Sequence, residues 1–189
     1  LQDGSGITKE TDLVVVSTAI EDTVYEVKKA KELGIPIIKR SQLLAMIAKS
    51  KKTVAVAGTS GKSTTSAMLF QILLDAGLEP SIISGAGLTS IIKQGKIGNA
   101  YVGKGDWLII EADESDGSVV QYEPEIGLLL NIDKDHQEID ELIELFTIFR
   151  KNTKGLYIVN QSNALAKTLS ANVNNDFGFE SEAGFTAKN

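Results

Sequence analysis

The chain has 189 residues, of which 42% are hydrophobic and 23% charged, as expected for one packed domain or parts of two. Its formal net charge of −6 argues against a general nucleic-acid binder, because a phosphate backbone needs a basic surface. The absence of cysteine excludes disulfides, zinc–thiolate sites and thiol nucleophiles, and no apolar run is long enough to span a bilayer. The first residues do not form a signal peptide, so a cytoplasmic protein is expected, with no membrane partner.

Strand and helix patterns alternate over the first 50 residues. Residues 12–17 (DLVVVS) predict a short buried strand, and the apolar spacing over 22–33 predicts a helix that ends at Gly34. A second strand is predicted at 35–38 and a second helix at 41–48. We expect a domain boundary at Lys51-Lys52.

The same alternation continues to the end of the chain. The predicted strands cover 53–57, 81–84, 107–111, 126–130 and 156–159, and the predicted helices cover 62–76, 139–152 and 163–170. The glycine-rich residues 85–105 predict loops and a weak hairpin. This order predicts an α/β fold with a mostly parallel sheet and helices on both faces. Ligands of such sheets bind beyond the carboxyl ends of the strands.

The predicted strand 53–57 runs directly into a glycine-rich loop that the next helix follows. The loop consists of Gly58, Thr59, Ser60, Gly61, Lys62, Ser63 and Thr64. Glycines let backbone N–H groups turn towards an anion, and a helix N-terminus adds partial positive charge. Lys62 can then reach the β- and γ-phosphates of ATP, and the Ser63 hydroxyl can ligate Mg²⁺. The loop is shorter than the usual eight-residue signature, and the alternative is a plain strand–turn–helix joint with a chance Gly-Lys-Ser.

Two more polar clusters follow predicted strands. Glu111–Gly117 (EADESDG) places four carboxylates within six positions, which indicates either an acidic surface loop or a Mg²⁺ site facing the phosphate loop. His136 is the single histidine and follows the strand at 126–130. It is either structural or a neutral imidazole that binds a metal directly or through water, although Mg²⁺ prefers oxygen ligands.

Together these clusters resemble the Mur ligase family, the ATP-dependent amide-forming enzymes of peptidoglycan assembly, over roughly residues 10–189. The segments that carry the resemblance are AGTSGKSTT (57–65), EADESD (111–116) and NIDKDH (131–136). The acidic string is similar to the branch that adds L-alanine to UDP-N-acetylmuramate and to the sister branch that recycles a murein tripeptide. Val16–Ile20, Arg40 and Leu43-Leu44 resemble the end of that branch's first domain.

The resemblance implies that 1–50 is the C-terminal part of a Rossmann-like, UDP-sugar-binding domain, and that 51–189 is a P-loop-type central ATP-binding domain. The front of the first domain and the third domain would lie outside these residues, so the chain alone is not expected to turn over. Lys62 would hold the ATP phosphates. Ser63 and Glu111 would ligate Mg²⁺, and His136 would lie on the second-metal side.

The implied reaction joins an amino acid or peptide to a UDP-N-acetylmuramate-type substrate. A substrate carboxylate attacks the γ-phosphate to give an acyl phosphate and ADP, and an amine then displaces phosphate. In this reading Lys62, Glu111 and His136 are the catalytic residues.

Two departures from the family pattern leave alternatives open. Ser60 stands where the family commonly has histidine, and residues 137–140 (QEID) lack the expected aspartate-then-aromatic pattern. The alternatives are the tripeptide-recycling ligase, a folylpolyglutamate synthase-like ligase, a kinase-like or switch-type P-loop protein and a non-catalytic nucleotide-binding paralogue. The acidic string argues against the folylpolyglutamate branch. The lack of an Asn-Lys-x-Asp string argues against a switch.

Overall fold

A computed structural model describes residues 3–134, 137–179 and 181–187 of the chain. The chain divides into two compact units, Leu1–Ile47 and Ala48–Asn189. In the first unit, β1 (Val14–Val16) and β2 (Ile37–Lys39) form a parallel pair, and α1 (Tyr25–Glu32) connects them. The helix α2 (Arg40–Lys49) follows β2 directly. The predicted order of strand, helix, strand and helix is confirmed.

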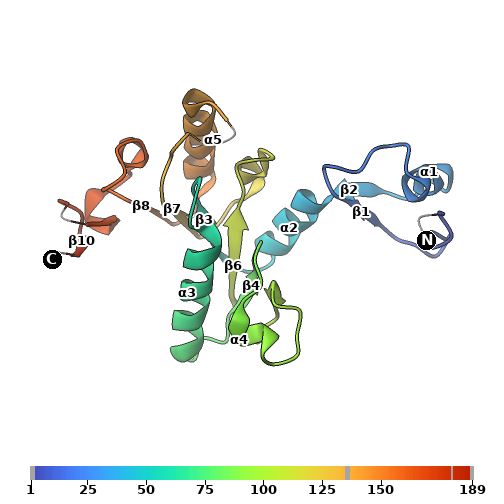
Figure 1. Ribbon diagram of the computed structural model, residues 1–189, viewed down its shortest axis with the longest axis horizontal. Coiled ribbons are helices and arrows are strands. Elements are labelled where there is room, and N and C mark those ends of the chain that lie inside the picture. The colour runs from blue at the N-terminus through green and yellow to red at the C-terminus, as the bar shows by residue number, and fades with distance from the viewer. Residues whose placement is uncertain (1–2, 135–136, 180, 188–189) are drawn as a thin grey trace. The chain divides into compact units, whose positions relative to one another are not determined.

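The second unit is built on a six-stranded sheet with the order β5-β4-β6-β3-β7-β8 (Figure 1). Its strands are β3 (Lys52–Ala57), β4 (Ser81–Ile83), β5 (Ala100–Tyr101), β6 (Trp107–Ala112), β7 (Ile126–Leu129) and β8 (Leu156–Val159). Only β5 runs antiparallel to its neighbour, so the prediction of a mostly parallel sheet is confirmed. The central strand β3 lies between β6 and β7, and the five parallel strands end on the same edge.

Helices cover both faces of this sheet. On one face, Phe70 of α3 (Lys62–Asp75) packs in a core cluster with Val54 and Ile109. On the other face, Phe149 of α5 (Ile139–Asn152) meets the ring of Tyr157 edge-on, with the ring centroids 6.0 Å apart. Because side chains alternate along a strand, neighbouring positions of the buried strands supply the two cores.

Two predicted segments differ from the structure. The predicted helix at 163–170 is only a 3₁₀ turn, Ala166–Leu169, preceded by an Asn163 side chain that accepts a hydrogen bond from Ala166 N at 2.8 Å. Local side-chain bonding of this kind favours a short turn over a long helix. The region 85–105 contains the short helix α4 (Thr89–Ile92) before β5, in addition to loops.

The remaining elements were not predicted. They are the 3₁₀ turns η1 (Ser118–Gln121) and η3 (Val173–Asn175) and the parallel strands β9 (Phe177–Phe179) and β10 (Phe185–Ala187). Each strand is only three residues long, which is too short for an apolar period to be recognised. Within the described ranges, none of the helices has the length and apolar character needed to cross a membrane.

Candidate nucleotide-phosphate site

The phosphate loop connects β3 to α3 through two glycines with positive φ. Gly58 has φ 138° and Gly61 has φ 78°, a region that other residues rarely adopt. A Cβ atom at Gly58 would also lie 3.1 Å from Leu130 Cβ and 3.2 Å from the Asn131 backbone. Glycine is therefore required here for both conformation and space.

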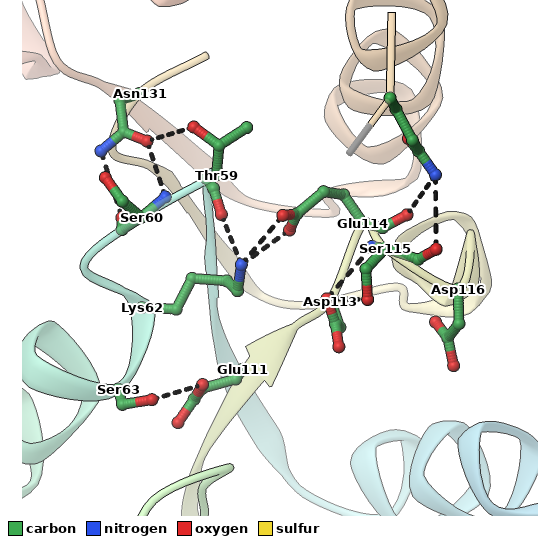
Figure 2. Close-up of polar contacts among 12 residues, drawn as sticks. Thr59, Ser60, Lys62, Ser63, Glu111, Asp113, Glu114, Ser115, Asp116 and Asn131 are labelled. Carbon is green, nitrogen blue, oxygen red and sulfur yellow. Dashed lines mark hydrogen bonds and ion pairs between the residues drawn. The ribbon is translucent and has the colours of Figure 1, made fainter. Parts of the chain in front are cut away.

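Lys62 is the first residue of α3, and its ammonium lies inside the loop. Its Nζ donates to Gly58 O at 2.7 Å and pairs with both carboxylate oxygens of Glu114, at 2.8 and 3.1 Å (Figure 2). The side chains are only 15% and 6% exposed, so this ion pair is well shielded from solvent. The lysine is thus held by one backbone carbonyl and one carboxylate at the mouth of the loop.

Glu111, at the end of β6, faces the next residue of the same helix. Ser63 Oγ donates to Glu111 Oε2 at 2.9 Å. The other oxygen, Oε1, accepts from Ser84 Oγ at 2.6 Å and from Gly85 N at 2.8 Å. Adjacent oxygen ligands of an octahedral Mg²⁺ lie about 3 Å apart, because each sits about 2.1 Å from the metal. The Ser63 and Glu111 oxygens therefore fit neighbouring positions on one such ion.

The other carboxylates of the acidic string shape their own loop. Asp113 accepts from Ser115 N and Oγ at 3.1 and 2.9 Å, and Asp116 accepts from Ser118 N at 2.9 Å. Across the ranges that the structure describes, no group of three His, Cys, Asp or Glu side chains is arranged to hold a metal. The four carboxylates therefore have three separate roles and do not form one cluster.

His136 lies outside the described residues, but the segments on either side of it contact the site. Before it, Asp133 N donates to Thr59 Oγ1 at 3.1 Å. After it, Gln137 Nε2 donates to the backbone oxygen of Glu114 at 3.1 Å.

Two residues of the site were missed by the sequence interpretation. Glu114 was included only as part of the acidic string, and Asn131 only as part of the string NIDKDH. Asn131 Oδ1 accepts from Ser60 N at 2.9 Å and from Thr59 Oγ1 at 2.8 Å, and its Nδ2 donates to Ser60 O at 3.1 Å (Figure 2). The sequence feature that could have identified them is their position, because each residue lies just past the end of a strand that neighbours β3.

This geometry defines the class of the protein. A buried parallel strand, a tight glycine turn and a helix that begins with lysine form a phosphate-loop nucleotide-binding fold. The carboxylate from the adjacent strand end completes the arrangement at the edge where such sheets bind ligands.

Family comparison agrees and is more specific. The family model described as "Mur ligase middle domain" matches residues 56–189, and "Mur ligase family, catalytic domain" matches residues 2–52. The chain belongs to the Mur ligase family.

Its relatives include enzymes named UDP-N-acetylmuramate–L-alanine ligase. The one from Nostoc sp. is 45% identical over 147 residues, which cover 76% of this chain and 29% of the relative. The one from Gloeothece citriformis is 37% identical over 180 residues, covering 93% of this chain and 35% of the relative. The solved UDP-N-acetylmuramate-alanine ligase from Thermotoga maritima superposes with a TM-score of 0.79 at 26% identity, covering 91% of this chain and 40% of that one. The chain thus spans about a third of the length of these relatives.

Proposed function

We propose that the loop 58–64 binds the phosphates of ATP with Mg²⁺ in a ligase that joins an amino acid to UDP-N-acetylmuramate. The observation that carries the proposal is the meeting of three groups at one loop: the Lys62 ammonium, the Ser63 hydroxyl and the Glu111 carboxylate. Mur ligases are ATP-dependent, which agrees with a site of this chemistry.

Each group has a distinct task. Lys62 places a positive charge against the β- and γ-phosphates, and its bond to Gly58 O keeps the ammonium within the loop. Ser63 and Glu111 would hold Mg²⁺, which neutralises phosphate charge when bound. Ser84 and Gly85 hold the Glu111 carboxylate by its second oxygen, so its orientation is set before any ligand arrives.

The substrates are proposed from the names of the relatives. A carboxylate of a UDP-N-acetylmuramate-type molecule attacks the γ-phosphate of ATP, which forms an acyl phosphate and releases ADP. The amine of an amino acid then attacks the acyl carbon, and phosphate and a proton are released. We assign residues 1–50 to the end of a sugar-nucleotide-binding domain and residues 51–189 to the ATP-binding domain. The first unit of the structure, Leu1–Ile47, covers most of the first of these segments. His136 is retained as a candidate for the second-metal side.

The test is binding of ADP and ATP, each with Mg²⁺, measured by calorimetry on the 189-residue chain. Lys62→Ala should weaken binding at least about tenfold, the usual scale for a lost hydrogen bond to a charged group. Lys104→Ala is the matched control, because Lys104 precedes the start of β6 whereas the site lies at its end. Failure of the wild-type chain to bind either nucleotide, or equal binding by Lys62→Ala, would overturn the proposal.

A further inference from the structure

The phosphate loop lies against the segment that follows β7. Leu130 N donates to Ala57 O at 2.9 Å, and Thr59 N donates to Asn131 O at 3.3 Å. The parallel pairing of β3 and β7 thus continues past the ends of both strands. The tight fit of Gly58 against Leu130 and Asn131 brings the two backbones into direct contact.

The Asn131 side chain adds a second set of bonds. Its carbonyl oxygen accepts from Ser60 N and Thr59 Oγ1, while its amide nitrogen donates to Ser60 O. Asparagine offers a donor and an acceptor at this reach, whereas aspartate offers only acceptors. Both backbone polar groups of Ser60 are therefore bound by one side chain from another strand end.

We infer that Asn131 is a positioning residue that presets the phosphate loop for its anion, an inference that rests on the proposed nucleotide function. Ser60 C=O and Gly61 N–H belong to one planar trans peptide, in which the two groups point in opposite directions. Because Asn131 holds the Ser60 oxygen, the Gly61 N–H is directed away from Asn131. The Ser60 N–H is already bound, so the phosphate donors are the N–H groups that follow it.

The segment carrying Asn131 is itself held from the region after β8. Asn163 Oδ1 accepts from Ile132 N at 3.2 Å, and Asn163 Nδ2 donates to Asp133 Oδ1 at 3.2 Å. Asp133 N in turn donates to Thr59 Oγ1. The backbone next to Asn131 is therefore held in place, so the Asn131 side chain fixes the position of the phosphate loop.

The experiment compares Asn131→Ala with Asn152→Ala by calorimetry with MgADP and by thermal unfolding. Asn152 is a matched control, since it is also half-buried and its Nδ2 donates to a backbone oxygen, Val120 O, at 2.8 Å. We expect Asn131→Ala to weaken MgADP binding about tenfold and Asn152→Ala to change it less than about twofold. A merely structural role would lower the melting temperature and leave the affinity of the folded chain unchanged, which would overturn the inference.

Asn131→Asp provides a second test of the inference if the alanine variant does not fold. It retains the acceptor bonds and loses the donor to Ser60 O. We expect weaker MgADP binding that persists at high salt, because a lost donor is not screened whereas simple charge repulsion is. Wild-type affinity in this variant, or affinity fully restored by salt, would contradict the inference. The proposed function fails separately, if the wild-type chain binds no nucleotide or if Lys62→Ala binds as well as wild type.

Discussion

If Lys62 binds a nucleotide phosphate as proposed, Glu114 competes with that phosphate for the same ammonium group. The Lys62 ammonium donates to both carboxylate oxygens of Glu114, and both side chains are shielded from solvent. A nucleotide phosphate that binds Lys62 must share or replace this partner. Burial makes the exchange costly, because a shielded carboxylate that loses its counterion loses a strong interaction.

We therefore expect Glu114→Gln to tighten MgADP binding about fivefold, since the neutral amide competes less for the ammonium. Titration calorimetry at constant ionic strength measures the change. Asp116→Asn is the control, because Asp116 lies in the same loop but binds Ser118 N and not Lys62. Weaker binding by Glu114→Gln would mean that Glu114 supports the nucleotide and does not compete with it.

The sequence interpretation assigned a role to Glu111 but none to Glu114. Glu111 and Glu114 are three positions apart in one acidic string, and only the turn after β6 directs one towards Ser63 and the other towards Lys62. The loop lysine and serine were predictable because their chemistry depends on adjacent residues. Glu111 was expected beside Ser63 from the family resemblance, whereas the pairing of Lys62 with Glu114, 52 positions away in the chain, was not predicted.

At the level of elements, β8 and α5 show what the hydrophobic pattern predicts well. Both match their predicted bounds, since each combines a clear apolar period with polar ends. The 3₁₀ turn at 166–169 was mistaken for a helix, because four residues carry too little periodicity to separate the two. The strands β9 and β10 were not predicted, because three residues are also too few to show a period.

Tyr157 places a hydroxyl in the core between these two elements. The side chain is 5% exposed, and its oxygen has no hydrogen-bond partner among the described residues. Burial, with a smaller contribution from Asp176, raises the pKa of this hydroxyl above its ordinary value of 10.0, against an opposing effect of Arg150. The unfolded chain ionises first as the pH rises, so wild-type stability is full below pH 10 and falls above it.

Tyr157→Phe should remove this alkaline loss. At neutral pH we expect the variant to be equal to wild type or more stable by up to about 1 kcal/mol, because an unpaired buried hydroxyl is removed. Urea unfolding at neutral pH and above pH 10 measures both effects. Tyr25→Phe is the control, because Tyr25 is 64% exposed. A variant that loses stability with alkaline pH as steeply as wild type would show that another group is responsible.

At the scale of the whole molecule, the described groups of the candidate site come from one unit. The phosphate loop, its lysine and the Glu111 carboxylate all belong to the second unit. The chain aligns with only 29% to 35% of the relatives' length, and the proposed ligase reaction would need two further substrates in addition to ATP. The proposed nucleotide binding and the proposed turnover can therefore be tested separately.

We expect the 189-residue chain by itself to bind MgATP without releasing phosphate in response to UDP-N-acetylmuramate and L-alanine. A coupled phosphate assay, with the full-length Nostoc relative as positive control, measures this. Turnover that depends on the amino acid would show that these residues suffice for catalysis.

The hydrogen bonds between Asn131 and residue 60 also determine which amino acids position 60 can accept. Asn131 binds the backbone N–H and C=O of Ser60, and every amino acid except proline has both groups. The side chain of residue 60 therefore does not determine the conformation of the phosphate loop through these bonds. A serine at position 60, where the family resemblance implies a histidine, is therefore compatible with the same hydrogen bonds to Asn131.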